Sequence, residues 1–320
     1  MPDSLFQHQH ILHASDRAWP ESNCYVDLWI ELLHAQGFEP LAALGFTVAQ
    51  GFEGDQFTFF KFPPEDLRAL FGLEVQELAI YDSVEAHAAE QLRLGRSVLV
   101  EVDSFYLPDT RGTAYRSQHV KSTIAFAGLD AAARRLDYFH NAGRFALEGE
   151  DYDGVFRRLP HLRDNPDILF PYVEFVRRTS PPPRGRALLD GARSLLGQHL
   201  RRRPERNPIT AYRDAFSGHV ERLAERPMAY FHLYAFNVLR QLGANAELLG
   251  SHLRWLSGQG EGGLVEAAEA CDTLAGSAKA LQFQLARAVH RRTFGDFTPL
   301  LDAMERAYDT AVGGLARRYG

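Results

Sequence analysis

One of the two cysteines in the chain stands where a nucleophile is expected. In the segment WPESNCYVDLWIELL, Asn23 is a favourable N-cap residue and Cys24 is the first residue of a predicted helix. The first N–H groups of a helix have no intrahelical acceptor, and the helix dipole adds positive potential there, so a thiolate is stabilised. Cys24 is therefore a candidate nucleophile. The alternative is a small core residue, because free cysteines are among the most buried residue types.

A cysteine nucleophile needs a base, and His119 is the best placed of the histidines. It opens the predicted strand HVKSTIAFAG, in which the alternation of side chains can direct the imidazole toward a facing helix. A third group then holds the ring in one tautomer. Asn141, which ends the segment RRLDYFHN, is the preferred choice for this group, with Asp137 and His140 as the alternatives.

Other polar residues near these motifs are candidates for substrate contacts. Either Asn23 or the backbone N–H of Cys24 is expected to stabilise an oxyanion. Asp103, in VEVDSFYLP, is expected to make structural hydrogen bonds, and recognition of a substrate amine is the alternative. Three further residues are expected either to line the cleft or simply to pack: Tyr106, Tyr115 and Arg116.

The first half of the chain predicts an α+β domain that positions these residues. Apolar residues repeat at helical spacing from Tyr25 to Leu33 and Gly37 follows them, so the cysteine helix has one buried face. Helices followed by closely spaced strands indicate an α+β fold. Further helices are expected at 65–72 and 83–94, and strands at 56–62, 97–107, 119–130 and 134–141.

The segment TSPPPRGR marks the boundary between two predicted domains, residues 1–178 and 185–320. Its three prolines continue neither a helix nor an interior strand. The second domain predicts helices alone, which indicates an all-α bundle. These helices are expected at 186–203, 208–225, 228–241, 245–257, 263–291 and 295–318, with Gly243 among the residues that separate them. Cys271 lies among small residues in one of them and is expected in the core.

The composition limits the classes of function. A net charge of −6 and a pI near 6.1 leave no basic field for a polyanion, so nucleic-acid binding is not expected. No run of about 18 apolar residues occurs, so neither export nor a membrane span is expected. Two distant cysteines suit a reducing compartment such as the cytoplasm. The acidic segments 52–56 and 149–154 lack the ligand alternation of a calcium loop, so turns and no metal are expected there.

The order Cys24, His119, Asn141 resembles the papain-like fold, in which the cysteine opens a helix and the other two residues lie on later strands. The resemblance implies a papain-like α+β lobe followed by a helical lobe. One departure lies just before the cysteine. Papain-like proteases carry a glutamine there for the oxyanion hole, whereas this sequence reads DRAWPES, which argues against efficient peptide hydrolysis.

Two closer resemblances concern carrier-bound substrates. The stretch VLVEVDSFYLPDT and the His119 strand resemble the papain-like acyltransferases of butirosin biosynthesis, which move an aminoacyl group from the phosphopantetheine thiol of a carrier protein to an amine. A second match, covering most of residues 15–176, is to a bacterial family without an assigned reaction, whose genes are associated with those of amino acid:carrier-protein ligases. It rests on the segments NCYVDLWIELLHA, FEGDQFTFFKF, FYLPDTRGTAYRSQHVKSTIA and YFHNAGRFALEGEDYDGVF.

These resemblances imply a thiol-dependent acyl or aminoacyl transferase. Its partners are then a carrier protein and an amine-bearing acceptor, and no cofactor is needed beyond the phosphopantetheine arm that presents the substrate. The basic run HLRRRPER (199–206) is either a solvated helix end or a dock for the acidic carrier or its phosphate. Two alternatives stay open: a peptidase, amidase or thioesterase in which water accepts the acyl group, and a papain-like binding protein without catalysis. The oligomeric state is also open.

Overall fold

The fold comes from a computed structural model that describes residues 9–165 and 167–320, so the first eight residues of the predicted first domain lie outside it. The described residues form two compact units. The first contains the described parts of residues 1–11 and 67–182 together with Asn23–Phe38, and the second contains Leu12–Ser22, Glu39–Asp66 and Pro183–Gly320. Two segments of the predicted first domain, 12–22 and 39–66, therefore group with the helical residues, because their apolar side chains are buried there.

The first unit is built on a six-stranded antiparallel sheet with the strand order β1-β6-β2-β3-β4-β5. Its strands are β1 (Leu73–Glu77), β2 (Ser97–Asp103), β3 (Lys121–Asp130), β4 (Arg135–His140), β5 (Gly143–Glu148) and β6 (Val173–Arg178). Its helices are α1 (Cys24–Ala35), α3 (Val84–Arg93), α4 (Gly149–Val155), α5 (Pro160–Arg163) and the short 3₁₀ turns η3 (Ser104–Tyr106) and η4 (Pro108–Thr110). The sheet and its preceding helices confirm the α+β class.

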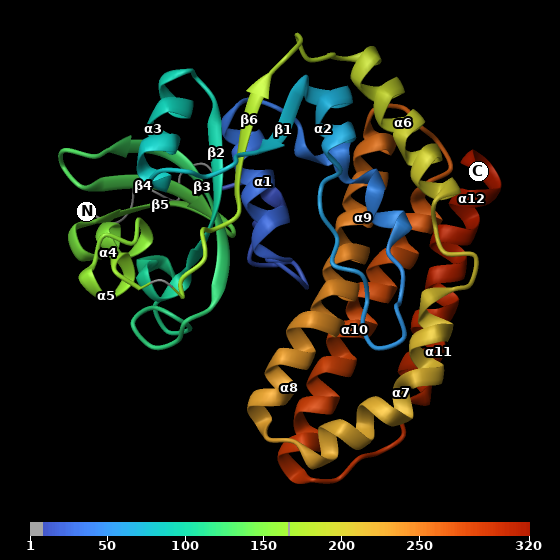
Figure 1. The fold of residues 1–320 in the computed structure, drawn as a ribbon. Helices are drawn as coiled ribbons and strands as arrows, with labels where there is room; N and C mark the ends of the chain where they lie inside the picture. Colours follow the sequence, from blue (N-terminus) through green and yellow to red (C-terminus); the bar gives the residue numbers. More distant parts are fainter. Residues whose placement is uncertain (1–8, 166) are drawn as a thin grey trace. The chain divides into compact units, whose positions relative to one another are not determined.

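Helix α1 covers one face of this sheet, and α3 and α4 cover the other (Figure 1). The hydroxyl of Tyr25 in α1 donates to Oε2 of Glu174 in β6 at 2.9 Å, which fixes the face on which α1 lies. Glu174 pairs with Leu99 across the ladder, so side chains alternating from Leu99, including Asp103, share that face. The opposite face carries the apolar core around Val100, Ile124 and Tyr138.

The second unit is helical. Its long helices α9 and α10 lie side by side, and α11 packs against α10 (Figure 1). The elements are η1 (Ile11–His13, at the unit boundary), η2 (Pro40–Ala49), α2 (Pro64–Phe71, which continues into the first unit), α6 (Arg186–Arg201), α7 (Pro208–Glu225), α8 (Met228–Tyr234), η5 (Ala235–Arg240, a π-helix), α9 (Gln241–Gly258), α10 (Val265–Arg291), α11 (Thr298–Tyr308), η6 (Asp309–Gly313, a π-helix) and α12 (Gly314–Tyr319). Its helical character confirms the prediction for the second half of the chain.

Three local predictions are wrong. Residues 56–62 form no strand, and Phe57 makes a single β-bridge to Phe52, because the aromatic side chains pack against helices instead of a ladder. The acidic segment at 149–154 is α4 and not a turn, with Tyr152 fully buried. Gly243 lies inside α9, where a Cβ atom would stand 2.4 Å from the indole of Trp19, so this glycine permits a close approach and does not separate helices.

Two buried histidines make the second unit sensitive to acid. Nδ1–H of His252 donates to the carbonyl of Leu41 at 2.7 Å, and burial lowers the pKa of His252 from 6.5 to about 4. Burial, with a contribution from Arg222, lowers the pKa of His219 to about 4 as well. Both imidazole rings are neutral in the folded protein, so the unfolded chain binds protons more readily than the native protein does.

We expect the free energy of unfolding to decrease as the pH falls from 6.5 toward 4, the interval between the ordinary and lowered pKa values. Each histidine contributes a slope of about 1.4 kcal/mol per pH unit. The substitution His252→Asn keeps a donor for Leu41 but removes the titrating ring, so it should reduce the slope by about half. Urea unfolding at several pH values measures this, and the exposed His290→Asn is the control. Equal slopes in wild type and His252→Asn would contradict the assignment.

Candidate active site

Cys24 is the first residue of α1, as the sequence predicts. Its N-cap Asn23 has extended backbone angles, and Oδ1 of Asn23 accepts a hydrogen bond from the N–H of Val26 at 3.0 Å. This cap confirms the predicted start of the helix. Asn23 is buried, whereas Cys24 is partly exposed and has a free thiol. The cysteine thus combines access with the positive end of a helix that is buried along most of its length.

His119 pairs with Asp103 and not with a residue of β4. The distance from Nδ1 of His119 to Oδ2 of Asp103 is 2.5 Å, and Oδ1 of Asp103 accepts the N–H of Phe105 at 3.0 Å. A carboxylate at Nδ1 fixes the neutral ring with its proton on that nitrogen, so Nε2 carries the lone pair. A histidine in this tautomer, oriented by a carboxylate, is suited to act as a general base.

An aromatic platform holds the same imidazole. The ring of His119 stacks on Phe105 with centroids 4.5 Å apart and planes inclined by 10°. The side chain of His119 is 68 % exposed, so Nε2 is accessible although Nδ1 is bonded to Asp103. Stacking and the carboxylate together restrict the ring without burying it.

Helix α1 and Asp103 belong to the same face of the sheet. Asp103 pairs with Lys121 at the end of the β2–β3 ladder and is separated from Leu99 by an even number of residues. Glu174, the partner of Tyr25, lies opposite Leu99 on that face. The alternation therefore places α1 and the side chain of Asp103, which contacts His119, on one side of the sheet. Within the described residues, no hydrogen bond joins the thiol of Cys24 to His119.

Asn141 occupies the two-residue turn between β4 and β5. His140 pairs with Gly143 across this hairpin, and Asn141 has a φ of 47°. Asparagine is one of the residues that tolerate this left-handed conformation in a tight hairpin turn. In the part of the chain that the structure describes, Asn141 makes no hydrogen bond to His119. Asp137, one alternative third group, forms ion pairs with Arg135 and Arg144.

The predicted cleft residues form a connected set of contacts beside α4. The hydroxyl of Tyr115 donates to Asp151 at 2.9 Å, and Arg116 pairs with Asp151 and Glu150 at 2.5 and 2.9 Å. The guanidinium of Arg116 also lies over the rings of Phe105, Tyr106 and Tyr115. The ring of Tyr106 is buried, and burial together with Asp103 raises the pKa of its hydroxyl. Arg116 thereby links the platform under His119 to α4.

The other alternative third group, His140, belongs to a second and buried network. Its Nδ1 lies 2.5 Å from Oδ2 of Asp109, and its Nε2 lies 2.6 Å from Oγ of Ser122. The hydroxyl of Tyr138 donates to the other oxygen of Asp109, and burial followed by Asp109 raises the pKa of Tyr138. Along β3 and β4, Ser122, Tyr138 and His140 alternate with the residues that point toward α1. The network therefore lies on the opposite face of the sheet, which α3 and α4 cover.

The Ser122–His140–Asp109 connectivity is that of a hydrolase triad, but its burial assigns it a structural role. Ser122 is 7 % exposed and His140 is 1 % exposed, so no substrate carbonyl reaches the hydroxyl. The network ties the loop that carries Asp109 to strands β3 and β4. Sequence reasoning missed Ser122 and Asp109. The period of two along β3 and β4 places Ser122 and His140 on one face, but nothing in the sequence indicates that the loop folds back onto them.

The basic run at 199–206 is largely paired within the second unit. His199 is buried and lies 2.7 Å from Asp66, and Arg202 lies 3.3 Å from Glu65. Arg206 forms an ion pair with Asp214. Arg201 is exposed at the end of α6. The arginines of this run therefore have less uncompensated charge than the sequence alone suggests.

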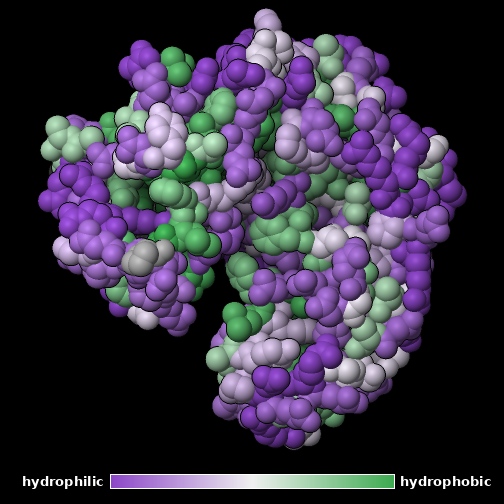
Figure 2. Space-filling model, in the orientation of Figure 1, coloured by the Kyte–Doolittle hydropathy of each residue, from purple (hydrophilic) through white to green (hydrophobic). Residues whose placement is uncertain are grey.

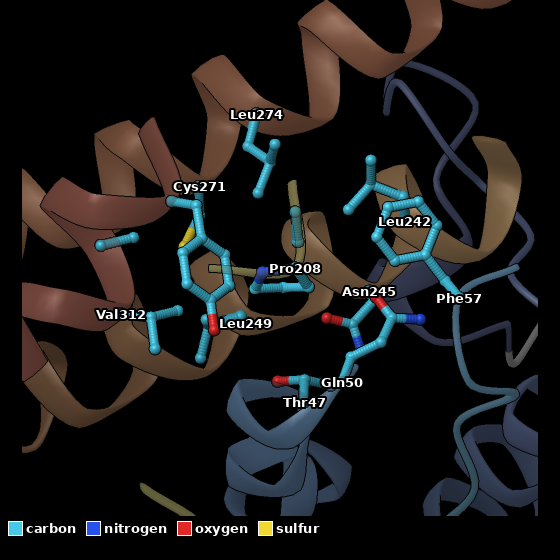
Figure 3. Close-up of a pocket in the computed structure, with 13 residues that line it drawn as sticks. Thr47, Gln50, Phe57, Pro208, Leu242, Asn245, Leu249, Cys271, Leu274 and Val312 are labelled. Atoms are coloured by element: carbon cyan, nitrogen blue, oxygen red, sulfur yellow. The ribbon is translucent and has the colours of Figure 1, made fainter. Parts of the chain in front are cut away.

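Cys271 lies in a different environment from Cys24. It is 1 % exposed, which confirms its predicted place in the core, and burial raises the pKa of its thiol to about 12. It lines a small cavity of about 20 Å³ in the second unit, opposite the polar side chains Thr47 and Gln50 (Figure 3). A space of this size accommodates about one water molecule. Cys271 is therefore unsuited to attack a substrate.

Family models match both parts of the chain. The DUF1839 N-terminal domain matches residues 8–178, and the DUF1839 C-terminal domain matches residues 185–317. No curated protein sequence matches the chain significantly. Across residues 9–165 and 167–320, no helix is both long enough and apolar enough to span a bilayer.

The exposure of the two thiols leads to a labelling prediction. Native protein treated with iodoacetamide should be alkylated at Cys24 and not at Cys271, and denatured protein should be alkylated at both. Mass spectrometry of tryptic peptides locates the label. Cys24→Ser should abolish native labelling and Cys271→Ser should leave it unchanged. A native adduct on Cys271, or none on Cys24, would contradict the assignment.

The buried Asp109 network leads to a stability prediction. Asp109→Ala leaves Nδ1–H of His140 and the hydroxyl of Tyr138 without their acceptor, so the free energy of unfolding should fall by about 3 kcal/mol. The control is Glu148→Ala, which removes an exposed carboxylate from its ion pair with Arg135. That change should cost at most about 0.5 kcal/mol, as for other surface pairs. Equal costs for the two variants in urea unfolding would refute a structural role for the network.

Proposed function

The chain belongs to the DUF1839 family, and we propose that it is a thiol-dependent acyl or aminoacyl transferase that forms an acyl-enzyme on Cys24. The observation that carries the proposal is the His119–Asp103 pair, with Nδ1 held by the carboxylate and the ring exposed. A partly exposed cysteine at a helix N-terminus on the same face of the sheet supplies the nucleophile. The papain-like relationship of the first unit is part of this proposal.

The proposed acyl donor is a thioester on the phosphopantetheine arm of a carrier protein. Nε2 of His119 takes the proton of the Cys24 thiol, and the thiolate attacks the thioester carbonyl. When the tetrahedral intermediate collapses, the C–S bond to pantetheine breaks and the departing thiolate receives the proton from His119. The new bond is again a thioester, so the exchange is nearly balanced in free energy and the site chiefly has to supply position and charge stabilisation.

The second half of the reaction transfers the acyl group to an amine. The acceptor nitrogen attacks the Cys24 acyl carbon, and His119 removes its extra proton. The amide leaves, and Cys24 departs as a thiolate that regains the proton. In each half the oxyanion needs N–H donors, and the backbone N–H of Cys24, which has no intrahelical acceptor in the first turn of α1, is the proposed donor. Asn23 is the second candidate, although its Oδ1 already accepts the N–H of Val26 as the helix cap.

The choice of amine over water as acceptor distinguishes this proposal from hydrolysis. The protein is incubated with an S-aminoacyl pantetheine thioester, and its intact mass is followed. We expect a mass increase that maps to Cys24, persists in buffer and disappears on addition of a primary amine. Cys24→Ala should form no adduct, and Cys271→Ala should behave as wild type. Rapid loss of the adduct to water would favour a thioesterase or amidase, and no adduct with any thioester would favour a binding protein.

The orienting group of His119 is tested by a matched pair of variants. Asp103→Asn should slow the acylation of Cys24 about 100-fold, because the amide no longer selects the tautomer with a free Nε2. Asn141→Gly retains the left-handed turn of the hairpin, so its acylation rate should stay close to wild type. Both rates come from the time course of the mass increase. The opposite pattern would transfer the orienting role to Asn141.

A further inference from the structure

We propose that a pocket of the second unit binds a small organic anion through Lys279 and Arg240. The pocket has a volume of about 290 Å³ and lies between the segment at Trp19, the π-helix η5 and the middle of α10. All of its lining residues belong to the second unit, so the site is independent of any reaction at Cys24.

Two cations line this pocket, and one of them, Arg240, is paired with the carboxylate of Glu21. Nζ of Lys279 lies 3.9 Å from the ring centre of Trp19, and within the described chain no carboxylate forms an ion pair with it. Glu247, which attracts Lys279 electrostatically, is engaged by Arg17 and by the N–H groups of Ala18 and Trp19. Burial, followed by the positive charge of Arg240, lowers the pKa of Lys279. A bound anion would relieve the repulsion between the two cations.

Arg240 is held in place for this role. Its Nε donates to the backbone carbonyl of Glu21, and Nη2 contacts the carboxylate of Glu21, both at 3.0 Å. The guanidinium also lies 5.1 Å from the ring centre of Phe236. Because these contacts fix the planar group before any ligand arrives, less conformational entropy is lost on binding.

The wall of the pocket is rigid. Trp19 is 5 % exposed, its indole N–H donates to the carbonyl of Ala275 at 3.1 Å, and its ring packs against Gly243 without room for a Cβ atom. Phe236 and Arg240 both lie in the π-helix η5. Single-turn π-helical segments of this kind occur frequently at functional sites.

Gln282 gives independent evidence for a ligand. It lines the pocket, and its Oε1 is buried without a hydrogen-bond partner among the described residues. Buried polar atoms are nearly always paired, so this oxygen, in the wall that also carries Lys279 and Arg240, is expected to accept a hydrogen bond from water or from a ligand that has a donor besides its anion. Amino, hydroxyl or amide N–H groups satisfy that requirement.

The rim of the pocket indicates an apolar part in the same ligand. Phe236 lines the pocket and is 41 % exposed, and the ring centre of Phe283, which is 55 % exposed, lies 6.0 Å from Nζ of Lys279. The space-filling view shows hydrophobic side chains at the surface over α8 (Figure 2). The chemical class is therefore a small organic oxyanion with an apolar body. A carboxylate and a phosphate ester both satisfy Lys279 and Arg240, so the test includes both.

The test measures binding of phenyl phosphate and of benzoate to the full chain by isothermal titration calorimetry, with benzyl alcohol as the uncharged comparison. We expect one of the two anions to bind with a Kd below about 1 mM, and benzyl alcohol to bind at least about tenfold more weakly. Tighter binding of phenyl phosphate identifies phosphate as the anion, and tighter binding of benzoate identifies a carboxylate. Absence of binding by both anions, or equal binding of benzyl alcohol, would overturn the proposal.

Variants then locate the site. Lys279→Met keeps an apolar chain over Trp19 but removes the charge, and it should weaken anion binding about tenfold. Arg287→Gln removes a charge from an exposed position of the same helix and should leave the Kd unchanged. Gln282→Leu provides a second variant if Lys279→Met does not fold as judged by circular dichroism, and should also weaken binding. If the folded pocket variants bind like Arg287→Gln, the proposed site is wrong.

Discussion

The carboxylate of Asp103 makes the interaction on which the candidate site depends. One oxygen accepts the N–H of Phe105 and so starts the turn η3, while the other holds Nδ1 of His119. Both ends of the intervening loop are joined by the ladder, since Asp103 pairs with Lys121 and the N–H of Ser104 donates to Val120. The ladder therefore closes the loop, and the side chain of Asp103 holds both the turn that carries Phe105 and the tautomer of the imidazole.

The loop between β2 and β3 takes part in two carboxylate–histidine pairs, and the burial of each pair distinguishes their roles. Asp103 lies on the α1 face, and the side chain of its partner His119 is 68 % exposed. Asp109 and His140 lie on the opposite face, where their side chains are 4 % and 2 % exposed. Both are carboxylate–histidine pairs at 2.5 Å, so geometry alone does not distinguish them. A base has to exchange protons with a substrate, and of these two histidines only His119 has the access for it.

The sequence predicts best where one local pattern determines the structure. The helical spacing from Tyr25 to Leu33 and the N-cap Asn23 define α1, and the start of α7 at Pro208 follows from the proline preference for the first helical turn. It fails where a distant side chain decides. Gly243 looks like a separator, yet it is a contact point for Trp19 more than two hundred residues away. For Asn141, the φ of 47° shows that asparagine suits the tight turn, and its part in catalysis stays a prediction.

The candidate site follows the same division. The start of the cysteine helix is recognisable because an N-cap is a local feature, whereas His119, which opens the predicted strand, lies in the loop two residues before β3. The partner of His119 is not recognisable from the sequence, because Asp103 reaches it only when the fifteen residues between them close into a loop. The domain boundary is a further case. The prolines at 181–183 mark a change of composition, and the two family models also divide there. In the folded chain, however, residues 12–22 and 39–66 belong to the compact helical unit. The chain therefore passes from one unit to the other between Ser22 and Asn23, immediately before the candidate nucleophile. Because Asn23 caps α1 while Trp19 and Glu21 line the anion pocket, the five residues from Trp19 to Asn23 contribute to both proposed sites.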